Sequence, residues 1–264
     1  MKAKGVACDF EILSGAAHAF ILFDYRYDNI FVGATLAWIC DYLKGKQYIG
    51  NYNIGKFIMK NVVIFGDSYS TFKEYIPEGF ETYYPALDVN SVEETWWNRL
   101  KKKNDFCLVQ NNSWSGSTIC YTGYGNSDCS KTSSFIYRYR KLKEESFFDK
   151  NSIDTIFVFG GTNDSWANVE LGECMLDSWK EEDLFYVRPA ISYFVSTLKK
   201  DMPFANIIVV INTQIKQEIQ DWLKQVAQYY GCSFVELQNV DKQDGHPTVK
   251  GMQDICEQIY SATI

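Results

Sequence analysis

Short apolar runs rich in β-branched residues alternate with longer amphipathic stretches from residue 61 to the end of the sequence. Continuous apolar runs of this kind are typical of strands that are buried on both faces. The predicted strands are residues 61–65, 106–110, 155–159, 206–211 and 233–237. Because strands that alternate with helices form parallel sheets with helices on both faces, the pattern predicts an α/β fold with a five-stranded parallel sheet.

The stretches that follow the strands carry apolar residues at spacings of three and four, with Lys and Glu between them. This spacing indicates helices with one buried face. The predicted helices are residues 92–102, 133–145, 183–200, 216–230 and 248–260. We therefore predict a domain over residues 56–264 and a small N-terminal strand–helix appendage over residues 1–55.

The charge and the apolar segments exclude several classes of function. The net charge is −7 and no basic cluster is visible, which argues against a nucleic-acid partner. The apolar run at residues 17–23 is far shorter than the roughly 20 residues of a membrane span. Asp9 and Glu11 fall where a signal peptide would be apolar, so the sequence as written is expected to be cytoplasmic.

Eight cysteines are present, without a Cys-x-x-Cys pair and without a histidine at zinc-ligand spacing. We therefore expect no metal site. A bridge between Cys120 and Cys129 would require an oxidising compartment and is the less favoured interpretation.

Polar clusters follow the first, second, third and fifth predicted strands. They are residues 66–68, 115–117, 160–164 and 244–247. Because the carboxyl ends of parallel strands meet at one edge of the sheet, we expect these clusters to lie close together.

Ser68 and His246 are the predicted nucleophile and general base. Ser68 follows the first strand in the sequence Gly-Asp-Ser, which on its own is also ordinary turn chemistry. A serine hydroxyl needs a base, and histidine titrates near neutral pH. Of the two histidines, His246 lies between the last strand and the last helix, whereas His18 stands between alanines, as packed histidines do.

Ester hydrolysis also needs hydrogen-bond donors for the oxyanion. The candidates are the backbone N–H groups of Ser68 and Gly116 and the side-chain amide of Asn163. Asn163 has an alternative role as the cap of the following helix.

Together these blocks resemble the SGNH (GDSL-like) hydrolase superfamily over roughly residues 60–262. Its four signature residues match Ser68, Gly116, Asn163 and His246, in that order. The resemblance implies a three-layer α/β/α, flavodoxin-like fold, hydrolysis of acyl esters through an acyl-enzyme, and no metal or organic cofactor.

One departure concerns the acidic member of the triad. The family usually places an Asp three residues before the His, and here that residue is Gln243. Asp244 and Asp241 are equal candidates to orient the imidazole. A backbone carbonyl is the third alternative and would leave a Ser-His dyad.

Two further sets of residues adjoin the motifs. Tyr69, Trp114 and Trp166 are candidates to shape the cleft or simply to pack, while Asp67 and Asp164 are expected to fix loops through backbone amides.

The leading functional hypothesis is an esterase for small acyl groups. Carbohydrate O-acetyl esters are the preferred substrate class, from the family resemblance and the aromatic content of 16%. A thioesterase or lysophospholipase stays within the same chemistry. A catalytically silent binding protein is the alternative that Gln243 suggests.

The N-terminal segment resembles the last strand, His loop and helix of an α/β-hydrolase, at residues 10–13, 15–20 and 32–43. No Gly-x-Ser-x-Gly elbow occurs in the sequence. We hypothesise that this segment is the tail of a larger two-domain esterase, in which His18 has no partner serine.

Overall fold

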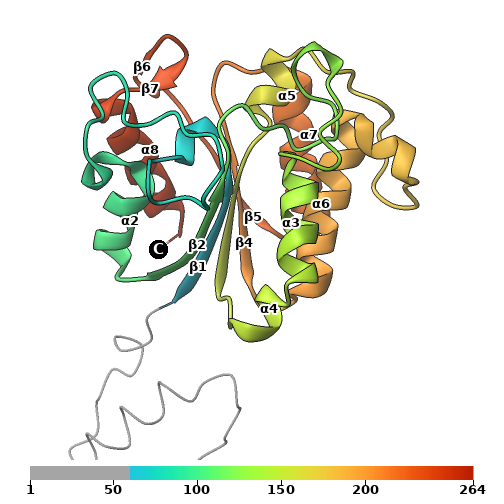
Figure 1. The fold of residues 1–264 in the computed structure, drawn as a ribbon, viewed down its shortest axis with the longest axis horizontal. Coiled ribbons are helices and arrows are strands. Elements are labelled where there is room, and N and C mark those ends of the chain that lie inside the picture. Colours follow the sequence, from blue (N-terminus) through green and yellow to red (C-terminus); the bar gives the residue numbers. More distant parts are fainter. Residues whose placement is uncertain (1–59, 264) are drawn as a thin grey trace, which may run out of the picture. The chain divides into compact units, whose positions relative to one another are not determined.

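The computed structural model describes residues 60–263, which form a parallel five-stranded sheet in the order β2-β1-β3-β4-β5 (Figure 1). Its strands are β1 (Asn61–Gly66), β2 (Cys107–Ser113), β3 (Thr155–Phe159), β4 (Asn206–Ile211) and β5 (Ser233–Glu236). The predicted α/β fold is confirmed. The proposed appendage, His18 and the domain boundary near residue 55 lie outside the described residues.

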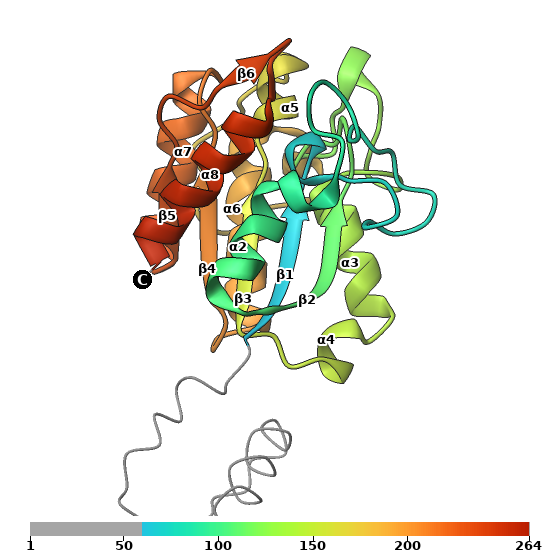
Figure 2. The same cartoon turned by 90° about the vertical axis from the view of Figure 1, so that its left-hand side faces the viewer.

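Helices cover both faces of the sheet and give the three layers that the family resemblance implied. One face carries α2 (Trp96–Asn104) and α8 (Val249–Thr263), which Figure 2 shows lying across the strands. The other face carries α3 (Phe135–Glu144), α6 (Val187–Asp201) and α7 (Gln217–Tyr229). None of the helices within residues 60–263 is long and apolar enough to cross a membrane.

The strands are apolar because successive side chains enter two different cores. In β1, Val63 and Phe65 belong to the cluster with α3, α6 and α7, whereas Val62 and Ile64 belong to the cluster with α2 and α8. Alternation of side chains across a strand requires both faces to be apolar when both are covered.

The prediction that all five strands are buried on both faces is wrong for the two edge strands. β5 is mostly exposed or half-buried, and β2 is exposed or half-buried over its first four residues. β2 also continues three residues beyond the predicted run, through Asn111, Asn112 and Ser113. These polar residues are buried because their side chains form hydrogen bonds inside the protein.

Two predicted helices are interrupted near their N-terminal ends. Residues 92–94 form a 3-10 turn, η4 (Val92–Glu94), and α2 starts only after Thr95, whose hydroxyl accepts a hydrogen bond from the N–H of Asn98. Likewise η6 (Glu181–Phe185) is separated from α6 by the extended residue Tyr186. The apolar spacing continues across both breaks, so periodicity alone does not locate them.

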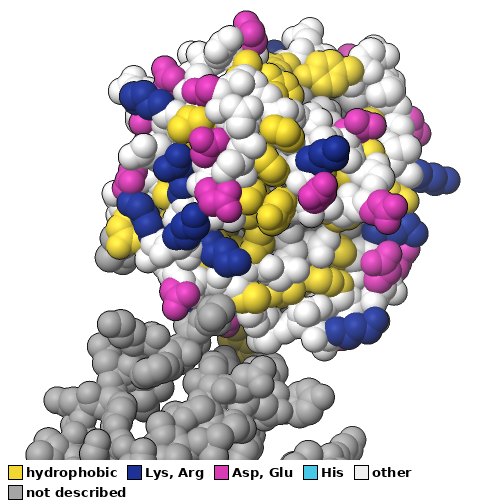
Figure 3. All heavy atoms as spheres, turned by 60° about the vertical axis from the view of Figure 1, so that its left-hand side comes forward, with side chains coloured by type: hydrophobic (Ala, Val, Ile, Leu, Met, Phe, Trp, Pro, Cys, Tyr) yellow, Lys and Arg dark blue, Asp and Glu magenta, His cyan; other side chains and the backbone are white. Residues whose placement is uncertain are grey.

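Several short elements gather at the carboxyl edge of the sheet (Figure 1). They are the 3-10 turn η3 (Ser68–Ser70), the short helix α5 (Thr162–Trp166) and the antiparallel pair β6 (Lys242–Gln243) and β7 (His246–Pro247). The other short elements are η5 (Tyr124–Asn126) and α4 (Phe147–Lys150). On the face drawn in Figure 3, Lys and Arg side chains are interspersed with Asp and Glu.

Candidate active site

Ser68 and His246 meet at the carboxyl edge of the sheet. Ser68 begins η3, with one residue between it and the end of β1, and its Oγ lies 3.0 Å from Nε2 of His246 on β7. Ser68 is buried and His246 is half-buried. Burial, assisted by the charge of Lys242, lowers the pKa of His246 below its ordinary value, against the opposing effect of Asp244. The imidazole is therefore neutral at neutral pH and able to accept a proton.

The other imidazole nitrogen faces the main chain. Nδ1 of His246 lies 3.2 Å from the backbone carbonyl oxygen of Asp244. Since a carbonyl can only accept, Nδ1 carries the hydrogen and Nε2 is the nitrogen that accepts from Ser68. The Asp241 carboxylate accepts instead from the hydroxyl of Thr248. Within residues 60–263 neither candidate carboxylate forms a hydrogen bond to His246. The group that orients the imidazole in the structure is the backbone carbonyl of Asp244, the third of the alternatives considered from the sequence.

The turn that presents Ser68 is shaped by its two preceding residues. A side chain at Gly66 would bring a Cβ within 2.5 Å of the Ser113 hydroxyl, so only glycine fits between the ends of β1 and β2. Asp67 accepts a hydrogen bond from the N–H of Tyr69 and is fully buried. Burial raises the pKa of Asp67 to about 7. As expected, Asp67 fixes the loop.

The predicted oxyanion donors come from the three segments that follow β1, β2 and β3. Gly116 has a φ of +78°, a left-handed conformation that glycine adopts without strain. The N–H groups of Ser68 and Gly116 donate to no protein atom in the described part of the chain. Asn163 donates from Nδ2 to the carbonyl of Ser117 at 3.0 Å, which leaves its second amide hydrogen for a ligand.

Asn163 does not act as a helix cap. The N-cap of α5 is Gly161, and the Asn163 side chain turns instead toward the loop that follows β2. Its Oδ1 accepts a hydrogen bond of 2.8 Å from the hydroxyl of Tyr124, a residue that the sequence did not single out. Because a carbonyl can only accept, the contact with Ser117 fixes which end of the amide is the donor.

The β6–β7 hairpin that carries His246 is held by aromatic side chains. The hydroxyl of Tyr69 donates to the carbonyl of Gly245, and that of Tyr84 donates to the carbonyl of Pro247 at 2.6 Å. The ring of Trp166 stands edge-on to His246, with centroids 5.5 Å apart. Gly245 has a φ of +77°, and a Cβ there would lie 3.0 Å from Trp166.

A family model described as GDSL-like lipase/acylhydrolase matches residues 60–263. The chain belongs to this family. A putative GDSL-like lipase from Bacteroides uniformis is 40% identical, with a TM-score of 0.72, and the match covers 78% of this chain and 95% of that one. A second, from Bacteroides ovatus, is 38% identical with a TM-score of 0.71, covering 77% and 97%. No curated protein matches the chain.

The same fold occurs in a family two carbohydrate esterase from Clostridium thermocellum in complex with cellohexaose. That protein is 15% identical, with a TM-score of 0.53, and the match covers 76% of this chain and 62% of that one. Membership of the GDSL-like family makes the chain a hydrolase that acts on esters.

A buried arginine, Arg138, holds together the segments that carry the candidate site, and the sequence analysis did not predict it. The guanidinium of Arg138 donates to the Gly66 carbonyl at 3.2 Å, to the Ser117 hydroxyl at 3.1 Å and to Asn112 Oδ1 at 2.7 Å. It therefore joins the ends of β1 and β2 to the loop of Gly116. Burial lowers the pKa of Arg138 to about 9, against the attraction of Asp67. The available signal in the sequence was its spacing, three residues after Phe135 and four before Leu142, which places Arg138 on the buried face of α3.

Lys242 anchors the hairpin to the end of β4. Its ammonium donates to Asn212 Oδ1 at 3.1 Å and to the Thr213 carbonyl at 3.0 Å. Asn212 in turn donates to the hydroxyl of Thr162 in α5. Burial lowers the pKa of Lys242 to about 8.

The described domain contains neither a cluster of potential metal ligands nor a disulfide. No group of three or more His, Cys, Asp or Glu side chains within residues 60–263 could hold a metal ion. Cys120 and Cys129 are free thiols, so the bridge considered from the sequence is not present.

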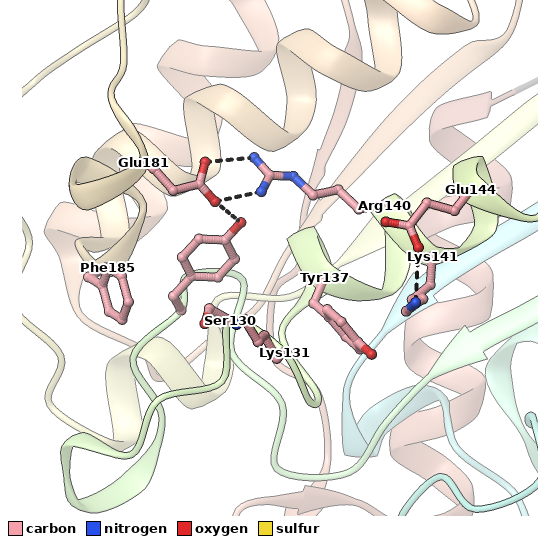
Figure 4. A pocket seen from close by; sticks show the side chains of 9 residues that line it. Ser130, Lys131, Tyr137, Arg140, Lys141, Glu144, Glu181 and Phe185 are labelled. Atoms are coloured by element: carbon pink, nitrogen blue, oxygen red, sulfur yellow. Dashed lines mark hydrogen bonds and ion pairs between the residues drawn. The ribbon is translucent and has the colours of Figure 1, made fainter.

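A surface hollow of about 320 Å³ is lined by residues other than Ser68 and His246 (Figure 4). Its wall includes Arg140 and Glu181, which form an ion pair of 2.5 Å, and Tyr121, which donates to Glu181 at 2.9 Å. These charged groups satisfy one another, and none of the predicted site residues lines the hollow. We do not assign the active site to it.

Proposed function

We propose that the protein hydrolyses small acyl esters through an acyl-enzyme on Ser68, with His246 as the general base. The observation that carries this proposal is the 3.0 Å contact between Ser68 Oγ and His246 Nε2. The backbone carbonyl of Asp244 takes the orienting position, so the catalytic unit is a Ser-His dyad.

In the first half-reaction, His246 Nε2 takes the hydroxyl proton while Ser68 Oγ bonds to the ester carbonyl carbon. The oxyanion accepts hydrogen bonds from the N–H groups of Ser68 and Gly116 and from Asn163 Nδ2. The carbon–oxygen bond to the alcohol then breaks, and that oxygen takes the proton from His246.

In the second half-reaction, water attacks the acyl carbon and gives its proton to the same nitrogen. The Ser68 ester bond then breaks, Oγ regains the proton and the carboxylic acid leaves. The lowered pKa of His246 supports this scheme, because the imidazole is neutral at the start of each half-reaction.

The proposed substrates are carbohydrate O-acetyl esters. Two exposed aromatic side chains contact residues of the site: Trp166, 38% exposed, packs against His246, and Tyr124, 47% exposed, donates a hydrogen bond to Asn163. Such rings offer an apolar face and a polar atom, which suits a sugar. The fold is also that of a carbohydrate esterase in complex with cellohexaose.

The test is hydrolysis of 4-nitrophenyl acetate and butyrate, and acetate release from acetylated xylo-oligosaccharides, by the full chain and its Ser68→Ala variant. We expect activity that disappears in Ser68→Ala and prefers acetyl over butyryl groups. Labelling of Ser68 by a 4-nitrophenyl alkylphosphonate, read by mass spectrometry, reports the nucleophile directly. Matched melting temperatures show that the variant is folded.

Equal activity in both proteins, with no label on Ser68, would contradict the proposal and favour the silent binding protein. A preference for long acyl chains or thioesters would keep Ser68 but replace the substrate class with that of a lysophospholipase or thioesterase.

A further inference from the structure

The imidazole of His246 lies flat against the ring of Tyr83. Their centroids are 3.7 Å apart and their planes differ by 6°, so the two rings are stacked face to face. Tyr83 lies in the irregular stretch before η4 and is half-buried. It belongs to none of the four family motifs.

Face-to-face stacking is an unusual arrangement for two neutral rings. The negative faces of two neutral π-systems repel, and such pairs prefer offset or edge-on packing. A cation over an aromatic face is instead attracted to it. His246 becomes a cation whenever it takes the proton of Ser68 or of water, so the stack fits the protonated imidazolium better than the neutral ring.

The other groups around His246 leave this role open. Lys242 opposes a positive charge on the imidazole, and Asp244 favours it. Tyr69 is tilted at 48° to the imidazole and Trp166 stands edge-on at 74°. With no carboxylate hydrogen-bonded to it within residues 60–263, the imidazolium has the Asp244 carbonyl at Nδ1 and the face of Tyr83.

Tyr83 is positioned relative to the nucleophile itself. The hydroxyl of Thr71 accepts from the N–H of Tyr83 at 2.9 Å and donates to the carbonyl of Ser68 at 3.0 Å. On its other side, Tyr84 packs edge-on against Tyr83 with centroids 4.9 Å apart. One threonine thus links the stacked ring to the residue whose proton His246 would take.

We propose that Tyr83 is a positioning residue that stabilises the imidazolium of His246 through its ring face and so supplies part of what a carboxylate supplies in a Ser-His-Asp triad. The inference rests on the proposed function in that it requires the Ser-His dyad. The proposed stabilisation comes from the face of the aromatic ring and does not involve the phenol hydroxyl.

The direct test is the pKa of His246, measured by NMR on protein with labelled histidine. The chain has two histidines, and His18→Gln leaves a single signal to follow. Tyr83→Leu keeps an apolar group over the ring but removes the π face, whereas Tyr83→Phe keeps the face. We expect Tyr83→Leu to lower the pKa of His246 by about half a unit and Tyr83→Phe to leave it unchanged.

The kinetic readout uses Ser68-dependent hydrolysis of 4-nitrophenyl acetate. For Tyr83→Leu we expect kcat to fall about 3-fold to 10-fold with little change in KM, and the acid limb of kcat/KM to move to lower pH. Tyr83→Phe should keep wild-type values. Tyr83→Met serves as a second apolar variant if Tyr83→Leu does not fold.

The outcomes separate this inference from the proposed function. An unchanged or raised pKa in the apolar variants, with wild-type kcat, overturns the role of Tyr83 and leaves the dyad intact. Hydrolysis that does not depend on Ser68 overturns the proposed function, while the NMR titration still decides whether the stack stabilises the imidazolium.

Discussion

The two halves of the site are built in different ways. Ser68 and Asn163, each 2% exposed, follow β1 and β3, two strands in the middle of the sheet. His246 instead lies on β7, a two-residue strand paired only with the two-residue strand β6. Parallel strands with full backbone pairing hold the first half, and side chains from other segments hold the second.

The two halves are therefore expected to be sensitive to different kinds of substitution. The nucleophile half depends on buried polar groups, for which a lost hydrogen bond in a low dielectric is expensive. The base half depends on contacts to a short hairpin, most of which end on backbone atoms. Three predictions test this contrast, in order of decreasing effect.

The first prediction concerns Asn163 in the nucleophile half. Asn163→Ala removes an oxyanion donor that acts in the transition state, so kcat for 4-nitrophenyl acetate should fall by about 10²-fold to 10³-fold with KM nearly unchanged. Tyr124→Phe keeps the amide and loses only the hydroxyl that orients it, and should reduce kcat far less. A loss below threefold in Asn163→Ala would remove this residue from the oxyanion site.

The second prediction concerns the buried carboxyl of Asp67 and uses protein stability. Its pKa is raised from 3.8 to about 7 by burial, so between these values the unfolded chain is ionised there while the folded protein keeps the proton. That contribution to stability is complete below pH 3.8 and is lost as the pH rises through 7.

Asp67→Asn should abolish this pH dependence. Urea unfolding from pH 4 to 8 should show the wild-type free energy of unfolding declining relative to the variant, by no more than about 4 kcal/mol. Parallel curves for the two proteins would show that Asp67 is ionised in the folded state throughout.

The third prediction concerns the base half and expects the smallest effect. Asp244→Asn and Asp241→Asn should both keep kcat within about threefold of wild type, because the group facing His246 Nδ1 is main chain. Asp244 has a φ of +49°, a conformation that Asn also adopts readily. A loss of orders of magnitude in either variant would show that its carboxylate enters the site during catalysis.

The sequence predicts the strands and the residues that follow them better than the contacts that support the site. Buried strands appear as apolar runs, and Ser68 and Asn163 follow those runs directly. The supporting contacts have no such signal. Arg138 shares the spacing of the buried apolar residues of α3 but not their apolar character. Tyr83 is one of eighteen tyrosines and lies in a stretch without periodicity. Their roles follow from contacts between segments far apart in the chain.

The β6–β7 hairpin is fixed through carbonyl oxygens of its backbone, which makes it tolerant of side-chain substitution. Tyr69 and Tyr84 hold Gly245 and Pro247 by atoms that every residue type possesses, and Gln243 points into solvent beside them. Substitution at Gln243 leaves those anchors in place while changing the polarity of the exposed surface beside its hairpin partner His246. In directed evolution, the hairpin is therefore a position where new substrate preferences can be sampled at little cost to the alignment of the base.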